Sequence, residues 1–220
     1  MSESKQLQRY CANGLLALLL VSGSACWAEY EKATTSNDYR IVDLKPAQVN
    51  VDHLGLTACT GMFALSATRV LAACRSAKSD TAEDSGLRLF ILATEVTKAS
   101  ILSATRGLGD AYSVVLQQRV NEAGKYKNLI LADAAAEYAY GTAVYQLDGD
   151  KLNYLGDIGY VQMSAEENAI SALNITTLQA SKDGFKVSFS KDVHRMDNSG
   201  KYQRMDARKA AMLYDGKKLK

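Results

Sequence analysis

The chain has 220 residues, of which 47% are hydrophobic and 23% are charged, and its 26 basic and 24 acidic side chains leave a net charge of +2. This composition is typical of a folded globular protein and excludes an intrinsically disordered chain. Near-neutral charge with interleaved acids also gives no support to nucleic-acid binding, because a basic patch is the usual signature of that function.

The first 28 residues have the layout of a secretory signal peptide. Lys5 and Arg9 supply a basic start, residues 15–21 form an apolar run, and residues 22–28 are mostly small. This order of segments predicts cleavage after Ala28 and a protein that is periplasmic or secreted. An apolar run of about seven residues is far short of the ~20 that a membrane-spanning helix requires, so we expect no transmembrane segment.

A lipid anchor is the alternative at this end of the chain. Ser24, Ala25 and Cys26 resemble the end of a bacterial lipobox, which would attach a lipid to Cys26. Gly23 stands where such a motif usually carries a leucine-like residue. We therefore prefer the cleaved signal peptide and keep the lipoprotein as a minor alternative.

Residues 29–220 have the length of a single domain, and we expect one exported β-rich domain there. Removal of the signal peptide leaves two cysteines, Cys59 and Cys74. An oxidising compartment favours a disulfide between them, and their separation suits two strands joined by a turn. We interpret this bridge as structural, because the Cys-x-x-Cys spacing of redox pairs is absent.

Four segments have the pattern of strands, in the order Tyr39–Leu44, Leu87–Leu92, Tyr112–Leu116 and Phe185–Ser190. The second is a continuous apolar run, which is typical of a strand buried on both faces, and we expect the third to be a shorter strand of the same kind. The fourth alternates apolar and polar residues, which predicts one buried face.

Glycine turns with a nearby lysine separate many of these runs. Asp-Gly and similar pairs favour the tight turns of β-hairpins, so we predict hairpins at Ala123–Tyr126, Asp148–Leu152, Asp183–Lys186, Ser199–Tyr202 and Asp215–Lys218. Their recurrence favours an antiparallel meander or sandwich. Their uneven spacing argues against a true repeat, although a small propeller-like sheet with unequal loops remains the alternative.

Helical signals are few. Ser164–Glu167 has the form of a capping box before Ile170 and Leu173, which predicts a helix of two to three turns. Asp206 is placed to cap a second short helix through Leu213. The expected fold class is therefore mostly β, with one or two short helices.

Catalytic motifs are not evident. The two histidines, His53 and His194, have no partner at the spacing of a zinc site or a catalytic triad. Residues 106–110 contain two glycines but lack the third glycine and the lysine of a phosphate-binding loop, so we expect a turn. Accordingly, we expect neither a metal site nor a cofactor.

Residues 128–175 combine acidic charge with tyrosine. This stretch holds seven carboxylates against one lysine, together with five tyrosines. Tyrosine among carboxylates suits a protein interface, because the rings fill pockets on a partner and the charges attract a basic surface. The candidate binding residues are Tyr138, Tyr140, Tyr145, Asp148, Asp150, Tyr154, Asp157 and Tyr160. The alternative is that they are ordinary strand residues on a solvated face.

These features favour a non-enzymatic module that binds another envelope protein with a basic surface, as inhibitors and immunity-type proteins do. Export, a β-rich core and the lack of a catalytic motif all point to this class. Two alternatives stay open. One is a small hydrolase that uses carboxylates, and the other is a surface-tethered envelope factor anchored at Cys26.

Overall fold

The computed structural model describes residues 37–77, 80–84, 86–95 and 98–220. Over these ranges the chain forms several antiparallel β-sheets, and its helical turns are three-residue 3-10 helices at Asp52–Leu54, Ala82–Asp84 and Leu173–Ile175. The predicted mostly β class is confirmed. The predicted signal peptide with its cleavage site at Ala28, and the alternative lipid anchor at Cys26, lie outside the described residues.

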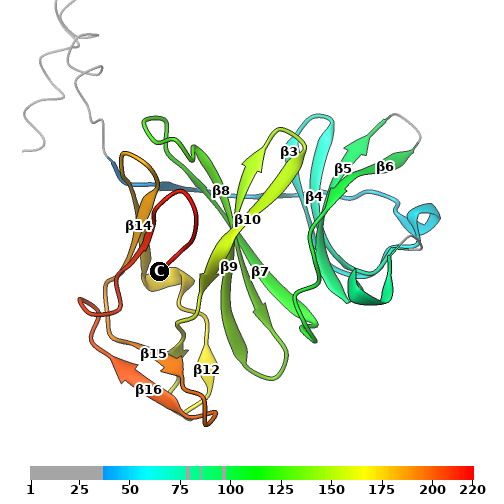
Figure 1. Ribbon diagram of the computed structural model, residues 1–220. Coiled ribbons are helices and arrows are strands. Elements are labelled where there is room, and N and C mark those ends of the chain that lie inside the picture. The colour runs from blue at the N-terminus through cyan, green and yellow to red at the C-terminus, as the bar shows by residue number, and fades with distance from the viewer. Residues whose placement is uncertain (1–36, 78–79, 85, 96–97) are drawn as a thin grey trace, which may run out of the picture. The chain divides into compact units, whose positions relative to one another are not determined.

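The first sheet has five strands in the order β2-β3-β4-β5-β6 (Figure 1). Their bounds are β2 Lys45–Pro46, β3 Thr57–Ser66, β4 Arg69–Arg75, β5 Leu87–Thr94 and β6 Ala99–Ala104. The apolar run at Leu87–Leu92 is fully buried, with Phe90 and Leu92 on one face and Leu89 and Ile91 on the other. This confirms the strand that the sequence predicted to be buried on both faces.

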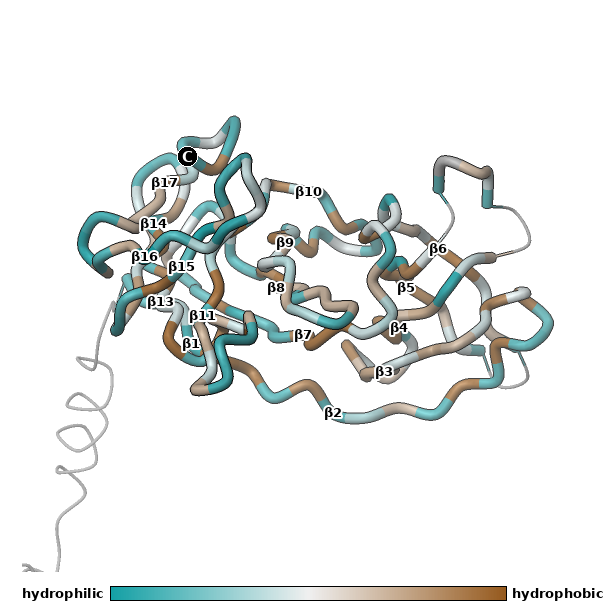
Figure 2. The backbone as a smooth tube through the Cα atoms, turned by 90° about the horizontal axis from the view of Figure 1, so that it is seen from below, coloured by the Kyte–Doolittle hydropathy of each residue, from teal (hydrophilic) through white to brown (hydrophobic). Residues whose placement is uncertain are grey.

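The second sheet also has five strands, in the order β1-β7-β8-β9-β10. Their bounds are β1 Arg40–Val42, β7 Ser113–Val120, β8 Asn128–Ala135, β9 Ala139–Asp148 and β10 Lys151–Ile158. One face packs against the first sheet, where Ile130 and Tyr145 meet Leu71. The opposite face carries Leu129 and Val144 and packs against the C-terminal strands. The second sheet is therefore the middle layer of three, as Figure 2 shows.

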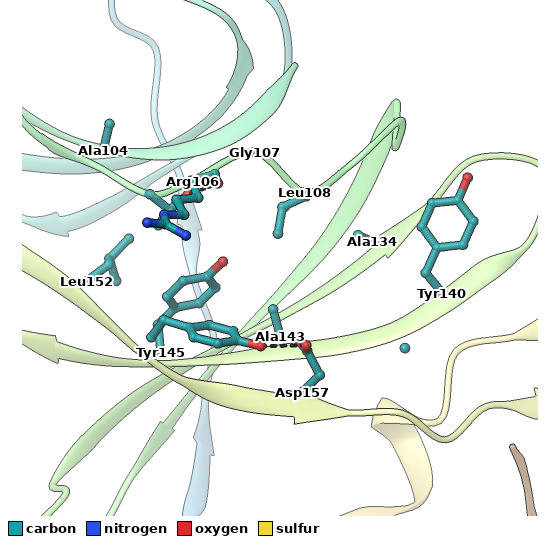
Figure 3. Close-up of a pocket in the computed structure, with 13 residues that line it drawn as sticks. Ala104, Arg106, Gly107, Leu108, Ala134, Tyr140, Ala143, Tyr145, Leu152 and Asp157 are labelled. Atoms are coloured by element: carbon teal, nitrogen blue, oxygen red, sulfur yellow. Dashed lines mark hydrogen bonds between the residues drawn. The ribbon is translucent and has the colours of Figure 1, made fainter. Parts of the chain in front are cut away.

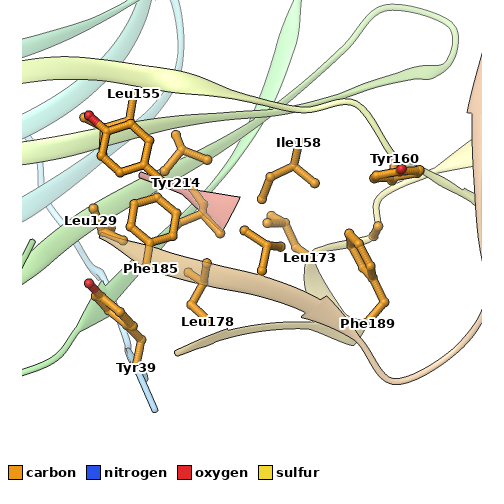
Figure 4. Packing of buried hydrophobic residues seen from close by; sticks show 14 of the residues in the cluster. Tyr39, Leu129, Leu155, Ile158, Tyr160, Leu173, Leu178, Phe185, Phe189 and Tyr214 are labelled. Atoms are coloured by element: carbon orange, nitrogen blue, oxygen red, sulfur yellow. The ribbon is translucent and has the colours of Figure 1, made fainter. Parts of the chain in front are cut away.

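The third layer consists of smaller sheets. β13 Thr176–Ala180, β14 Phe185–Phe189 and β17 Met212–Tyr214 form one of them, β11 Gln162–Met163 pairs with β12 Ala169–Ile170, and β15 Val193–Met196 pairs with β16 Tyr202–Met205. Phe185 is fully buried in this core and stacks on Tyr214 with ring centroids 5.1 Å apart (Figure 4). The rings of Tyr39 and Tyr126 meet it edge-on.

One extended segment, residues 37–47, contributes to all three layers, and we call it the strap. The Tyr39 backbone N–H donates to the Leu178 carbonyl oxygen at 2.8 Å, then β1 pairs with β7, and then β2 pairs with β3. In Figure 1 it is the blue segment that passes β8 and β4. The predicted first strand at Tyr39–Leu44 is confirmed as β1 and forms part of this strap.

The five predicted glycine turns all join antiparallel segments. Four connect β7 to β8, β9 to β10, β13 to β14 and β15 to β16, and the fifth returns the chain from β17 so that Tyr214 bridges Leu219. At the β9–β10 turn Asp148 faces Lys151, and Gly149 has a φ of +56°, which glycine adopts without strain. The meander β3 to β6 and the meander β7 to β10 follow chain order, and none of the described sheets closes on itself.

The predicted disulfide is present. Cys59 on β3 and Cys74 on β4 are bonded, with their Cα atoms 3.9 Å apart. The two strands are joined by the tight turn that the cysteine separation predicted. Cys74 is fully buried and belongs to the core between the first sheet and the segment around Val51 and Leu56.

Three local predictions are wrong. The expected helix after Ser164 is a turn followed by β12 and a single 3-10 turn, and the segment after Asp206 is one hydrogen-bonded turn before β17. The predicted strand at Tyr112–Leu116 is present, with residues from Ser113 onward in β7, but it is not buried on both faces: Val114 and Leu116 pack against the core, whereas Val115 is 59% exposed. No helix in the described part of the chain is long and apolar enough to cross a membrane.

Candidate functional site

A pocket of about 630 Å³ lies where the first two sheets meet (Figure 3). One wall is the link from β6 to β7, and the opposite wall is formed by β9 and β10. Its lining residues are Ala104, Thr105, Arg106, Gly107, Leu108, Ala134, Tyr140, Gly141, Ala143, Tyr145, Leu152, Tyr154 and Asp157. The volume falls in the range of sites that hold small molecules or peptide side chains.

A β-bulge in β10 brings two of the polar residues together. Residues three apart on a regular strand point to opposite faces, yet Tyr154 and Asp157 lie opposite Tyr145 and Ala143, which share one face of β9. The register shifts between Tyr154 and Gly156, where Gly156 has a φ of +137°. The extra residue therefore turns Tyr154 and Asp157 toward the same side, as bulges beside functional sites commonly do.

The result is a linked pair of polar side chains beside a second ring. The Tyr154 hydroxyl donates a hydrogen bond to Asp157 Oδ2 at 2.5 Å. The Tyr145 ring lies beside Tyr154, with centroids 5.7 Å apart and planes tilted by 59°. Tyr145 is almost fully buried whereas Tyr154 is 56% exposed, so the two rings line the floor and the mouth of the pocket respectively.

Both phenols stay protonated at neutral pH. Burial raises the pKa of Tyr145 to about 12, with the negative charge of Asp157 acting in the same direction and a hydrogen bond to the Thr105 hydroxyl opposing it. Burial and the hydrogen bond to Asp157 raise the pKa of Tyr154 well above its ordinary value. The two hydroxyls therefore serve as hydrogen-bonding groups and not as bases.

Arg106 supplies the positive charge of the pocket. Its backbone is held by the preceding residue, because the buried Thr105 accepts hydrogen bonds from Arg88 Nε at its carbonyl oxygen and from the Leu89 N–H at its hydroxyl. The exposed Arg106 guanidinium makes no hydrogen bond or ion pair within the described ranges. Figure 3 shows this side chain pointing toward Tyr145, with Tyr140 at the far end.

The structure places only some of the predicted binding residues in the pocket. Tyr140, Tyr145, Tyr154 and Asp157 line the pocket. Tyr138 is exposed outside the lining, and Asp148 is exposed at the β9–β10 turn. Asp150 is paired with Arg69, and Tyr160 is buried against Phe189 with ring centroids 5.4 Å apart. The eight residues therefore do not form one continuous surface.

Arg106 was missed by the sequence analysis, which expected only a turn at this position. The turn is present, as the link between β6 and β7. No local pattern marks Arg106, because its role depends on strands that meet only in the folded chain. Gly156 inside a strand is the one signal that pointed to this place, since an isolated glycine in a strand often marks a bulge.

The acidic groups of the pocket are few. Asp157 is the single carboxylate among its lining residues, whereas acid–base hydrolysis of the glycosidase type uses two. Elsewhere in the described chain no group of three or more His, Cys, Asp or Glu side chains is placed to hold a metal ion.

The chain matches no protein-family model, and it shows no significant similarity to a curated protein or to a solved structure.

Proposed function

We propose that this chain is an exported protein-binding module that receives a segment of a partner protein in the pocket between its first two sheets. The observation that carries this proposal is the pocket itself, in which two tyrosine rings, Asp157 and Arg106 converge with apolar walls. Concave sites that combine apolar walls with a few fixed polar groups are the usual places where ligands bind.

The surface around the mouth supports a protein partner. Tyr140 and Tyr154 are 46% and 56% exposed, and both belong to the lining. Tyr140 is hydrogen-bonded to the Asp110 side chain, and Glu137 lies close enough to raise its pKa further. Exposed tyrosines provide rigid contact area at a low entropic cost, and they are enriched at protein interfaces.

The charges at the mouth favour a basic partner. Asp110, Glu137 and Asp157 are close to Tyr140 and Tyr154, and Arg106 is the one basic residue among those that line the pocket. An acidic rim attracts a basic surface and speeds association, especially at low salt. This agrees with an inhibitor or immunity-type protein of the cell envelope, and we retain that class for the proposal.

The test is capture of a partner by the tagged chain, residues 29–220, from its native envelope extract at low and moderate salt. We expect one basic partner at stoichiometric level. Tyr154→Ala should reduce capture by about tenfold, because it removes a ring from the mouth of the pocket. Ile41→Ala is the matched control, since Ile41 is 52% exposed on the opposite edge strand of the same sheet.

Equal capture by the two variants would contradict the proposal, and so would an empty column with the wild-type chain. Circular dichroism and thermal melting of both variants establish that each remains folded. The captured protein is then purified, and its dissociation constant for wild type and variants is measured directly.

A further inference from the structure

We propose that the pocket binds the C-terminal carboxylate of a peptide segment, with Arg106 as the residue that holds it. This inference rests on the proposed function and specifies which part of the partner enters the pocket. The Arg106 guanidinium lines the pocket and forms no hydrogen bond or ion pair with another described residue.

Arginine is the best carboxylate ligand among the side chains, because its planar fork forms two parallel hydrogen bonds with the two oxygens. Four of the described arginines form ion pairs with aspartates: Arg69 with Asp150, Arg88 with Asp80, Arg204 with Asp192 and Arg208 with Asp206. Arg106 differs from these because its fork faces the pocket and is not occupied by any described side chain.

The backbone that carries Arg106 is fixed before any ligand arrives. Thr105 is buried, and the hydrogen bonds from Arg88 Nε at 2.6 Å and from the Leu89 N–H at 3.1 Å hold it beside β5. The Thr105 hydroxyl also donates to the Arg106 carbonyl oxygen at 2.9 Å. A binding residue on a rigid backbone loses less entropy on association than one on a free loop.

The remaining lining suits the end of a peptide. Leu108, Leu152 and Ala143 provide apolar walls for the last side chain. Asp157, with Asp110 near Tyr140, places negative charge at the same pocket, which suits a lysine or arginine near the peptide terminus. A ligand that carries both charges satisfies Arg106 and the carboxylates together.

The same two carboxylates disfavour a phosphate group. Phosphate carries up to two negative charges, whereas a peptide terminus carries one, so repulsion by Asp157 and Asp110 weighs more heavily against phosphate. A peptide also fills more of the roughly 630 Å³ than a free anion does. We therefore assign the site to a carboxylate at the end of a peptide.

The experiment uses a panel of peptides that end in a free carboxylate and contain lysine or arginine among the last three residues, each paired with its C-terminal amide. Binding to the chain of residues 29–220 is measured by fluorescence polarisation. We expect the best free acids to bind about tenfold more tightly than their amides. Inorganic phosphate should compete poorly.

Arg106→Gln should abolish the preference for the free acid, and Arg106→Lys should restore only part of it, because lysine keeps the charge without the planar fork. Arg40→Gln is the control, an exposed arginine on β1 at the other edge of the second sheet. It should retain the full preference. Thermal melting is recorded for each variant, so that a loss of binding is separated from a loss of folding.

Equal affinity for acid and amide would overturn the inference, as would the absence of binding across the panel or effective competition by phosphate. The proposed function is judged separately, by the captured partner. If Tyr154→Ala loses that partner and Arg106→Gln keeps it, the binding module stands and the carboxylate assignment fails.

Discussion

Arg69 at the start of β4 and Asp150 in the β9–β10 turn form a two-pronged ion pair, with Nε 2.6 Å from Oδ1 and Nη2 3.1 Å from Oδ2. The Ser103 hydroxyl donates to the Asp150 carbonyl oxygen at 2.5 Å. These contacts attach the tip of the β9–β10 hairpin to the first sheet. They lie next to Ala104 and Leu152, so they also fix one end of the pocket.

Asp150→Asn should lower stability at neutral pH by a small amount, because both partners are partly exposed. The hydrogen bond from Arg69 lowers the pKa of Asp150 below its ordinary value of 3.8. A carboxyl group whose pKa falls on folding stabilises the fold at pH values above its ordinary pKa. This contribution is lost as the pH falls through the lowered pKa. The difference in melting temperature between wild type and variant should therefore disappear as the pH drops below 3.8. A difference of the same size at every pH would contradict this assignment.

Asp133→Asn should show the opposite pH dependence. Burial raises the pKa of Asp133, and hydrogen bonds from the Ser171 and Thr142 hydroxyls offset part of that rise. A carboxyl group whose pKa rises on folding costs stability when it is ionised, so wild-type stability should increase as the pH falls from neutral through the raised pKa. The variant should lack this increase. Denaturant unfolding between neutral and mildly acidic pH measures it, and Asp192→Asn, which removes a carboxyl with a lowered pKa, is the control of opposite sign.

Cys59→Ser should destabilise the fold by about 3 kcal/mol, the chain-entropy value for a loop of this length. The bridge joins residues 15 apart in sequence, on two strands that are also paired by backbone hydrogen bonds. The reduced wild-type protein should melt at the same temperature as the variant. Unchanged melting after reduction would show that the strand pairing alone holds this hairpin. Partner binding should persist in the folded variant, since neither cysteine lines the pocket.

Phe185→Ala should cost about 3–5 kcal/mol, as expected for removing a large buried ring. Phe185 is fully buried and contacts the rings of Tyr39, Tyr126 and Tyr214, which come from the strap, the second layer and the third layer. Loss of this ring should therefore destabilise the strap, the second layer and the third layer together, in a single unfolding transition. Tyr138→Ala is the control, because a side chain that is 48% exposed should change stability by at most about 0.5 kcal/mol. Urea unfolding curves give both values.

Replacing Asp148 and Asp157 together by asparagine should slow association with the captured basic partner and flatten its dependence on salt. Asp150 is left intact in this variant, because its loss would also release Arg69. Association rates at several salt concentrations, measured by stopped flow, provide the test. An exposed acid on another layer, Asp183, gives the matched control when it is replaced by asparagine. Rates that respond equally to both sets of substitutions would place the interface elsewhere.

Much of the fold was predictable because its signals are local. The alternation of Phe185, Val187 and Phe189 predicts a strand with one buried face, and β14 has that face in the core. The glycine turns and the separation of Cys59 and Cys74 depend on short-range geometry, so they also predicted the hairpins correctly.

The failures occur where distant segments override a local preference. The Ser164 hydroxyl does accept backbone N–H groups, from Glu166 and Asn168, but the following residues pair with β11 instead of continuing as a helix. Asp206 closes one turn, and then Met212 pairs with Val187 on β14. The pocket escaped prediction for the same reason, since Arg106 lies in the link between β6 and β7 whereas Tyr154 lies on β10, and the two meet only in the folded chain.

The strap also determines the order in which the molecule can be completed. Its first residues bond to Leu178 on β13, while its later residues bond to β7 and β3. Contacts between such distant parts of a chain carry a large loop-closure entropy and slow folding. The first residues of the strap therefore reach their final position only once β13 has folded. Until then the edge of β13 that the strap covers stays open, and an unpaired strand edge is a site where chains can pair and aggregate.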